Sequence, residues 1–585
     1  MSIQDGADDK VKEMIRKINR VLTKPEKRKI IFLFFAMLVG SFLELIGISS
    51  ILPLLQTILN STAEGTGFFA GFLQIFLPAE KDKQVIVLST VTILLYCLKN
   101  IYLIAMYRYL FRVVYRGNAN LSTKMLRVYL HKDYTFHLTK NVSELQKSIR
   151  MDVAGFYTVV KDLLQILSEL IICLTLFVYL LFLNPWITLF MVVLLLLCTG
   201  GFFLFSRKKV KYFGKENNRT QTKMTQWILQ SMGGIKEVKV LGKEAYFEKK
   251  FEKEADQFAG VNMRHQLYMQ IPRPLTETAC IGGVLLLVII ATLRGTDLEQ
   301  MVPMLAVFAV SAFRLLPSVG KVNTYITEMT FHRISLENIY RDLQECEMEV
   351  NRETKPQETS CDFRKEIRIQ DLSFCYEGRE QLIFEKENLR IGCGEAVGLV
   401  GPSGQGKTTL ADLIMGLLHP TAGTIFVDDR DIAKCLGSWQ KKIGYVPQNI
   451  YLSDDTIMAN VAFGVWEEEI EESKVKRALE QAQILEFVNS LPQGYNTRIG
   501  DRGVQLSGGQ RQRIGIARAL YHNPEFLILD EATSALDQET ETAVMDAINY
   551  LHGEKTILII AHRLSTISGC DRVYRVENGH IYPEK

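Results

Sequence analysis

The feature that most constrains this 585-residue sequence is a set of six long apolar runs within its first 320 residues. A helix needs about 20 mostly apolar residues to cross the ~30 Å hydrocarbon core of a bilayer. Each run meets this length, so the first part of the chain is predicted to be an α-helical membrane domain. The predicted spans are 30–55, 85–110, 157–183, 185–205, 272–293 and 298–318.

Lysines and arginines predict the orientation of these spans. They crowd the N-terminal tail over 10–29 and recur at 207–209, directly after the fourth span. Loops rich in these residues stay on the cytoplasmic side. An even number of crossings then returns the chain to the cytoplasm near Lys321. In the outer loop, the apolar patch 68–73 fits either a short helix on the membrane surface or the end of the first span.

Overall charge and cysteine content narrow the possible partners. The chain has 68 basic and 65 acidic residues, a net charge of +3, which gives no reason to expect nucleic acid as a partner. Its 10 cysteines form neither a CxxC pair nor a metal-ligand spacing. We therefore expect reduced, structural thiols.

Beyond the membrane domain (1–340), a polar stretch over 341–365 has the composition of a linker. A soluble α/β domain is predicted over 366–585, because short apolar, β-rich runs alternate there with helical patterns. Three runs, 396–400, 526–529 and 556–560, each lead into a chemically suggestive residue. Ligands of open parallel sheets bind at the carboxyl ends of strands, so a binding site is expected where these runs end.

The run 396–400 leads into a phosphate-binding pattern, GxxxxGK[ST], over 401–408. Glycines allow backbone N–H groups to converge on a phosphate, and the following helix adds its positive N-terminus. Lys407 is predicted to reach the outer phosphates of ATP, and Thr408 to contact Mg²⁺. The candidate nucleotide-binding residues of this loop are Gly401, Ser403, Gly404, Gly406, Lys407, Thr408 and Thr409.

The run 526–529 ends in a pair of carboxylates. Asp530 suits a contact with Mg²⁺, and Glu531 is placed to orient or deprotonate the water that attacks ATP. Two neighbouring acidic residues alone would be a weak signal.

The segment Leu506-Ser507-Gly508-Gly509-Gln510, followed by a basic helix, makes the pattern specific. Together with Tyr376, the loop 401–408, Gln448, Asp530-Glu531, 534–537 and His562, it resembles the full motif set of ABC-transporter ATPase domains. The resemblance implies that Tyr376 stacks on adenine, that Gln448 contacts Mg²⁺, and that His562 holds the γ-phosphate. It also implies that Ser507, Gly508, Gly509 and Gln510 close on a nucleotide held by a second subunit. One chain carries one intact set, which implies a homodimer.

The order of the two domains also resembles ABC exporters, in which a six-helix membrane domain precedes the ATPase domain. Two cytoplasmic segments, 134–153 and 233–244, are similar to the coupling helices of exporters, which would transmit nucleotide-driven closure to the spans. Gln405 departs from the family pattern, where a small residue or cysteine is expected. Because the backbone forms the phosphate cradle, little effect is expected from Gln405.

Charged residues within spans are costly and raise a functional question. Lys99, Arg273 and Arg314 fall at similar depths toward the cytoplasm and could form one site for an anionic head group. On the sixth span, 311, 314, 318 and 321 recur at helical spacing and predict a polar stripe facing a cavity. Alternatively, Lys99 and Arg314 extend to the membrane surface and Arg273 pairs with Glu277. Glu44 fits a buried hydrogen-bonding residue.

Three short segments, 271–273, 313–318 and 443–452, resemble bacterial lipid-linked oligosaccharide flippases. This resemblance implies transfer of a polyprenyl-pyrophosphate-linked oligosaccharide to the outer leaflet of the bacterial inner (cytoplasmic) membrane for protein glycosylation. Paired arginines suit a diphosphate, which they can bind bidentately. An exporter of other lipids or hydrophobic drugs is the competing interpretation. Six spans argue against a soluble ABC-type ATPase.

Overall fold

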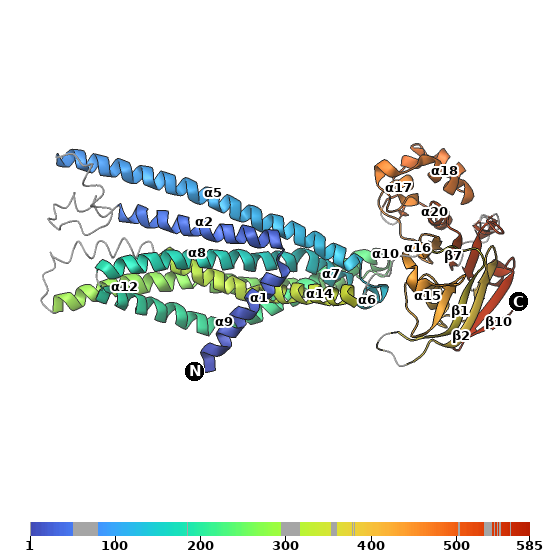
Figure 1. Cartoon of the computed structure of the whole chain (residues 1–585), viewed down its shortest axis with the longest axis horizontal. Coiled ribbons are helices and arrows are strands. Elements are labelled where there is room, and N and C mark those ends of the chain that lie inside the picture. Colours follow the sequence, from blue (N-terminus) through green and yellow to red (C-terminus); the bar gives the residue numbers. More distant parts are fainter. Residues whose placement is uncertain are drawn as a thin grey trace. The chain divides into compact units, whose positions relative to one another are not determined.

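The computed structural model describes residues 2–50, 80–183, 185–293, 316–352, 360–376, 378, 381–500, 503–531, 541–542, 544–546, 548, 551–561 and 563–584. The chain divides into two compact units (Figure 1). One comprises Met1–Lys132 and Thr139–Asn351, and the other comprises Asp133–Leu138 and Arg352–Lys585. The division at residue 351 falls within the predicted linker 341–365.

The first unit is helical throughout its described part (Figure 1). A π-helical turn, Ser148–Asp152, leads directly into the third predicted span. Residues 316–331 form a further helix. The labelled helices are α1 (Ser2–Val21), α2 (Lys24–Ser49), α5 (Lys81–Leu130), α7 (Val142–Lys147), α8 (Val153–Leu183), α9 (Pro185–Gly233), α10 (Ile235–Val240), α11 (Glu244–Gln270), α12 (Pro272–Leu293) and α14 (Arg333–Arg352).

Four helices of the described part are long and apolar enough to cross a membrane: Lys24–Gly47, Asp82–Leu130, Val142–Phe182 and Pro185–Gly233. They contain nearly all of the described parts of the first four predicted spans, and α12 coincides with the fifth. Only 316–318 of the sixth predicted span belong to the described residues, and the patch 68–73 lies outside them. The described structure therefore supports a helical membrane domain without testing the number of six spans.

Several of these helices extend far beyond the predicted spans. Helix α5 has 50 residues and α9 has 49, which corresponds to roughly 75 Å each at ~1.5 Å per residue. A hydrocarbon core of ~30 Å accounts for less than half of that length. Hydropathy predicts only segments of membrane-spanning length, whereas the helices continue through the sequence that follows.

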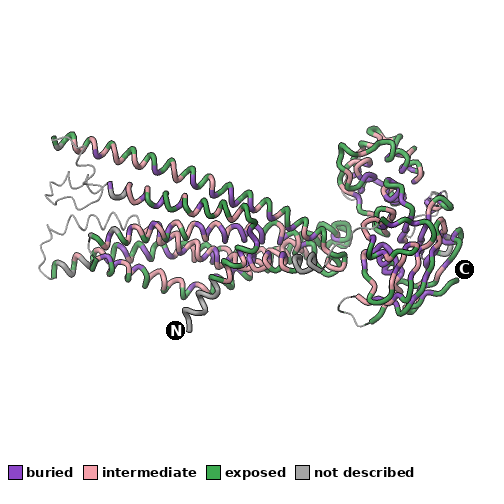
Figure 2. The backbone as a smooth tube through the Cα atoms, in the orientation of Figure 1, coloured by how far each residue is buried: buried purple, intermediate pink, exposed green. Residues whose placement is uncertain are grey.

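Many large apolar residues of the first unit are exposed. Figure 2 shows exposed positions along the outside of its helices. Phe42 is 62% exposed, Ile104 68% and Leu196 65%. Trp186 is 81% exposed at the beginning of α9, where an interfacial aromatic residue is expected. In water such a surface would associate with other apolar surfaces, whereas in a bilayer it faces lipid.

Close packing joins α9 to the helix 316–331. A Cβ atom on Gly214 would lie 2.2 Å from the backbone oxygen of Phe331, so only glycine permits this approach. The ring of Phe331 in turn stacks on His265 of α11, with ring centroids 3.8 Å apart. Burial lowers the pKa of His265 to about 4, so its imidazole is neutral at physiological pH. Three helices thus meet around one aromatic side chain.

The second unit contains two sheets. The first is antiparallel, with strand order β2-β1-β4-β5, and the second has the order β10-β9-β3-β8-β7-β6. In the second sheet, all neighbours from β9 to β6 are parallel and only β10 is antiparallel. The strands are β1 (Glu366–Phe374), β2 (Phe384–Gly392), β3 (Ala396–Val400), β4 (Ala422–Val427), β5 (Arg430–Asp431), β6 (Ile443–Val446), β7 (Phe526–Asp530), β8 (Thr556–Ile560), β9 (Arg572–Glu577) and β10 (His580–Pro583).

The three strands predicted from apolar runs are therefore confirmed as β3, β7 and β8. All five residues of each are buried, which explains why these strands read as continuous apolar runs without alternation. Trp439, which is fully buried, stacks on Phe526 of β7 with ring centroids 5.7 Å apart.

Short helices complete the second unit. They are α6 (Tyr134–Thr139), α15 (Lys407–Ile414), α16 (Leu436–Gln440), α17 (Ile457–Val461), α18 (Glu472–Gln481), α19 (Leu485–Ser490), α20 (Gly508–Leu520) and α22 (Leu564–Ile567). Helix α6 lies at the beginning of the first predicted coupling segment, and its residues up to Leu138 group with this unit.

Candidate functional site

The parallel sheet brings the sequence-predicted nucleotide residues to one edge. Strand β8 lies between β3 and β7, and Ile560 pairs with Leu399 on one side and Asp530 on the other. The carboxyl ends of three strands thus adjoin. The phosphate loop follows β3, and Glu531 follows β7.

The backbone of the phosphate loop takes conformations that favour glycine. Gly401 has φ of 142°, and a Cβ atom there would lie 2.1 Å from the backbone oxygen of Val576. Gly404 and Gly406 also have positive φ, at 79° and 99°. Gly406 directly precedes α15, so the loop ends on the N-terminus of that helix, where N–H groups without helical partners can bind phosphate.

Lys407 is held against its own loop. Its Nζ donates to the backbone oxygens of Gly401 at 2.8 Å and Pro402 at 2.9 Å. The residue is 5% exposed, and this burial lowers the pKa of its ammonium. An ammonium with so little hydration of its own is well suited to bind phosphate oxygens.

Thr408 and Asp530 bring oxygen atoms together beside the loop. The Thr408 hydroxyl lies 3.4 Å from Oδ1 of Asp530. Hydroxyl and carboxylate oxygens are the ligands that Mg²⁺ prefers. Nearby on α15, burial and the charge of Asp530 raise the pKa of Asp412 to about 6. The charge of Asp530 thus acts on its neighbours, and a divalent cation bound beside it would offset this charge.

Glu531 is hydrogen-bonded to Gln448, the residue that the family resemblance assigns to Mg²⁺. Gln448 Nε2 donates to Oε2 of Glu531 at 2.6 Å. The backbone of Glu531 has φ of 50°, in the left-handed region that is costly for a side chain of this type. Its N–H donates to the backbone oxygen of Ile560 at 2.9 Å, which fixes this conformation at the end of β7. Such strain occurs preferentially at functional sites.

Tyr376 lies beside the phosphate loop and is half-buried. Its hydroxyl is 3.1 Å from the Thr409 hydroxyl, and its ring packs edge-on against Phe374 with centroids 5.1 Å apart. Thr409 thereby positions the ring that the family resemblance assigns to adenine.

Ser507 caps helix α20. Its hydroxyl accepts from the Gln510 N–H at 3.2 Å, and its own N–H donates to Gln510 Oε1 at 2.8 Å. This reciprocal capping box fixes the helix start, and the N–H groups of Gly508 and Gly509 lie in its first turn. An exposed Ser507 and a helix N-terminus together form a surface suited to phosphate.

Gln405, which departs from the family pattern, anchors the loop. Its Oε1 accepts from the backbone N–H of Asn578 at 2.8 Å, in the turn between β9 and β10. Asn578 itself has φ of 51°. The side chain therefore replaces a small residue by binding the neighbouring turn, away from the backbone groups that cradle phosphate.

His562, the segment 534–537 and Arg314 lie outside the described residues. Their predicted roles are not tested by the structure.

Lys99, one of the three residues predicted to bind an anionic head group, forms an ion pair inside the membrane unit. The Lys99 ammonium lies 3.4 Å from Glu44 Oε1, and it also lies 4.5 Å from the centroid of the Tyr96 ring. Both charged side chains are at most 10% exposed. Glu44 is a buried partner as predicted, whereas Lys99 is engaged within the helices. This pairing favours a structural role for Lys99.

Arg273 is exposed, and within the described part of the chain no ion pair joins it to Glu277. On the helix 316–331, Ser318 is fully buried and Lys321 binds Glu169 of α8 at 2.9 Å. These two members of the predicted polar stripe thus contact this chain's own helices, while 43% of the Lys321 side chain stays exposed. Whether the stripe faces a cavity between two subunits is not tested by the single chain.

A polar cluster around Asp152 was not found from the sequence. Asp152 is 2% exposed, at the end of the π-helical turn. Its Oδ1 accepts from Asn218 at 3.1 Å and Ser335 at 2.9 Å. Its Oδ2 accepts from Asn338 at 3.1 Å and lies 3.1 Å from Lys147 Nζ. The partners come from three helices, α7, α9 and α14. A local sequence pattern therefore does not predict this cluster.

An apolar helical unit fused to an α/β unit with a phosphate loop and a capped signature helix defines the class of ATP-driven membrane transporters. Comparisons with known proteins identify the family. The protein-family model described as ABC transporter matches residues 384–534 of this chain. The family model described as ABC transporter transmembrane region matches residues 30–296.

Relatives that match over most of their own length belong to the same family. The ATP-dependent lipid A-core flippase of Cupriavidus pinatubonensis is 31% identical over 80% of this chain and 79% of its own length. The protein of the same name from Ralstonia nicotianae is 33% identical over 79% of this chain and 78% of its own length. A solved structure of a bacterial Atm1-family ABC exporter with ATP bound has the same fold, with a TM-score of 0.74 at 22% identity over 95% of this chain and 94% of that chain.

The chain belongs to the ABC transporter family and has the fused domain order of its exporters. It is an ATP-hydrolysing membrane transporter.

Proposed function

We propose that this transporter is a flippase of the bacterial cytoplasmic membrane that moves an anionic, lipid-linked oligosaccharide from the inner to the outer leaflet. The observation that carries the proposal is the similarity to lipid A-core flippases over about four-fifths of the chain. A polyprenyl-pyrophosphate carrier is the finer form of the proposal, and it rests on the resemblance of three short segments to lipid-linked oligosaccharide flippases.

ATP hydrolysis is assigned to the edge of the parallel sheet. The loop amides and Lys407 bind the phosphates, and Tyr376 stacks on the base. Glu531 accepts a proton from the attacking water, which Gln448 and His562 help to orient. The hydrogen bond between Gln448 and Glu531 supports this assignment, because it holds the carboxylate and the amide on one reacting site.

Mg²⁺ fits this site. Thr408, Asp530 and Gln448 would hold it through oxygen atoms, and the neighbouring hydroxyl and carboxylate support that choice. When bound, the ion offsets charge that develops on the phosphate oxygens. The chain's own contribution is to fix these oxygens at the ends of β7 and α15.

Two copies of the chain are required by this mechanism. Ser507, Gly508, Gly509 and Gln510 of one subunit close on the nucleotide that the loop of the other subunit holds. The exposed, capped start of α20 supports the assignment, because it presents N–H groups to a partner without rearrangement. A homodimer then has two equivalent ATP sites.

Arg273 and Arg314 are the proposed contacts for the pyrophosphate head group. Lys99 would support this site indirectly, because its ion pair with Glu44 neutralises a buried carboxylate that would repel the anion. Removal of one charge-assisted contact costs about 1.5–3 kcal/mol, or about ten- to a hundredfold in affinity. In proteoliposomes, Arg314→Ala should therefore strongly slow flipping of a polyprenyl-pyrophosphate-linked sugar, and the double variant with Arg273→Ala should slow it further.

The competing function is export of other lipids or of hydrophobic drugs, which the apolar interior of the membrane unit favours. Stimulation of ATP hydrolysis by a panel of lipid-linked sugars, phospholipids and neutral drugs separates the two. Unchanged flipping in the double arginine variant, at normal expression and folding, would contradict the anionic head-group site and favour this second function.

A further inference from the structure

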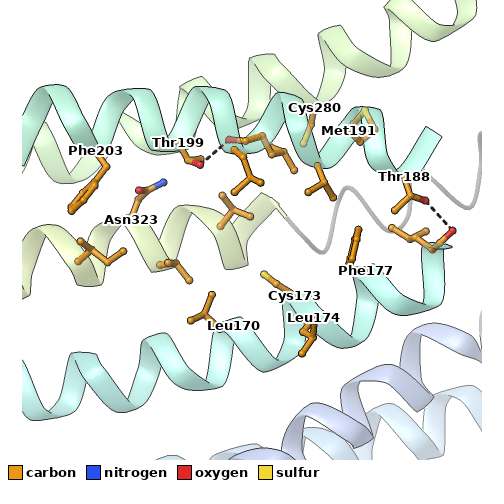
Figure 3. A pocket seen from close by; sticks show the side chains of 18 residues that line it. Leu170, Cys173, Leu174, Phe177, Thr188, Met191, Thr199, Phe203, Cys280 and Asn323 are labelled. Carbon is orange, nitrogen blue, oxygen red and sulfur yellow. Dashed lines mark hydrogen bonds between the residues drawn. The ribbon is translucent and has the colours of Figure 1, made fainter. Parts of the chain in front are cut away.

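A large cavity lies inside the membrane unit (Figure 3). It has a volume of approximately 470 Å³ and lies between α8, α9, α12 and the helix 316–331. None of the residues that line it is among those assigned above to ATP or to the charged head group. Eighteen residues line it, and most of them are aliphatic or aromatic.

The cavity runs along the membrane-spanning part of α9. Its lining on this helix extends from Thr188 to Phe203, a distance of about 22 Å at ~1.5 Å per residue. On α8 it extends from Leu170 to Leu180. One leaflet contributes about half of the ~30 Å hydrocarbon core. The cavity is therefore long enough for the hydrocarbon chain of a lipid from one leaflet.

The hydroxyl groups in the lining are already satisfied. Thr188 Oγ1 donates to the backbone oxygen of Leu180 at 2.9 Å, and Thr199 Oγ1 donates to that of Leu195 at 2.7 Å (Figure 3). These bonds consume the hydroxyl protons within the helices. The wall consequently offers little to water, and apolar cavities of this kind take up apolar ligands.

Asn323 is the exception. It is 7% exposed, and within the described part of the chain its side-chain amide makes no hydrogen bond. Figure 3 shows this amide extending toward Phe203 and Thr199. The amide therefore keeps hydrogen-bonding capacity beside the cavity, and a bound molecule with an acceptor oxygen at this position would be favoured.

The cavity also has an opening at the surface of the helical unit. Leu170, Leu174 and Leu196 belong to its lining and are 50%, 61% and 65% exposed. Because these residues lie in segments that are long and apolar enough to cross a membrane, this opening would face the hydrocarbon layer in a bilayer. A lipid chain can enter sideways without passing through water.

We propose that this cavity binds one hydrocarbon chain of the transported lipid, with an ester or phosphate oxygen of the same lipid accepting a hydrogen bond from Asn323. The inference rests on the proposed flippase function. It adds a second point of recognition, because most of the cavity lining belongs to α8 and α9, which carry neither of the two arginines proposed for the head group.

Two adjacent glycines provide a matched test. Gly200 lines the cavity, whereas Gly201 does not, and a Cβ atom on either would meet no atom within 4 Å. Gly200→Phe should therefore fill the cavity without a backbone clash, and Gly201→Phe places the same ring outside it. Loss of burial for even two methylene groups lowers affinity by roughly tenfold.

The full-length protein is reconstituted in vesicles that contain a phosphatidylglycerol with a photoactivatable 16-carbon chain, and labelled peptides are identified by mass spectrometry. We expect labelling of the α8 and α9 lining in the wild type and in Gly201→Phe. Labelling and lipid flipping should both fall about tenfold in Gly200→Phe, and Asn323→Leu should weaken both. Size-exclusion profiles and thermal unfolding confirm that the variants fold.

Three results would overturn the inference. If the lining is unlabelled in the wild type, another part of the protein or the partner subunit covers the cavity. If Gly200→Phe is labelled as strongly as Gly201→Phe, the chain binds elsewhere. If labelling falls while flipping continues at the wild-type rate, the bound chain belongs to a resident lipid and not to the transported one. A wild-type protein that flips no lipid but is labelled in the lining would refute the flippase function itself.

Discussion

Loss of the Asp152 carboxylate should strongly destabilise the helical unit. Each of its two oxygens has two donors, so the four lone-pair positions of the carboxylate are all used. In Asp152→Ala, the Lys147 ammonium, itself only 7% exposed, loses its countercharge. Removal of one member of a buried ion pair costs about 3–5 kcal/mol. A loss of this size lowers the Tm of a cooperative unit of a few hundred residues by roughly 5–10 °C.

Thermal unfolding of the detergent-purified protein, followed by tryptophan fluorescence and size exclusion, measures this effect. Asp256→Asn is the control, because Asp256 is exposed on α11, and its change should stay within about 0.5 kcal/mol. In the double variant Lys147→Met with Asp152→Ala, no buried charge is left without a partner. Its destabilisation should therefore be less than the sum of the two single variants.

The reasoning is refuted if Asp152→Ala unfolds within 1 °C of the Asp256→Asn control, taking ~1 °C as the smallest resolvable shift. Strict additivity in the double variant would separately show that Lys147 and Asp152 are not coupled, despite their 3.1 Å separation.

Glu531→Gln should still bind ATP but hydrolyse it at least a hundredfold more slowly, since an amide cannot accept the proton of the attacking water; steady-state phosphate release compared with nucleotide binding checks this. Co-assembled Lys407→Ala and Ser507→Arg chains should retain more ATPase activity than either variant homodimer, because one composite site stays intact, and an absence of rescue would contradict shared sites. Asp412→Asn should raise the Tm at pH 7.5, because the wild-type carboxyl, whose pKa rises from 3.8 to about 6 on folding, loses roughly 3 kcal/mol of stability as pH rises through that window. The gain should disappear below about pH 4, and exposed Asp454→Asn serves as the surface control for the substitution itself.

The strands and the phosphate loop were predictable because their signals are local. Strands β3, β7 and β8 are buried on both faces and therefore appear as unbroken apolar runs, and each leads directly to the edge of the sheet where ligands bind. Apolar runs also marked the membrane spans. They could not mark the ends of α5 and α9, because the extensions bury only one face, as at Leu121 and Met125 of α5, and so contain no continuous apolar run.

The polar contacts of the membrane unit depend on residues that are distant in sequence. Lys99 and Glu44 are 55 positions apart, and Asp152 and Asn338 are 186 apart. A charged residue within an apolar run indicates either a functional site or an internal ion pair. Which residue becomes its partner depends on how the helices pack. The sequence therefore identified Lys99 as unusual and could not decide between a ligand contact and an internal ion pair.

The length of α5 has a mechanical consequence. Its 50 residues contain no proline, the commonest cause of a kink, so it can behave as a single stiff rod. Tilting a rod of about 75 Å by about 10° around one end displaces the other end by about 13 Å. A rearrangement of a few ångströms at one end of such a rod is thus enlarged at the other without any change inside the helix. The half of α5 that a membrane anchor would not need thus has the length and stiffness of a lever arm.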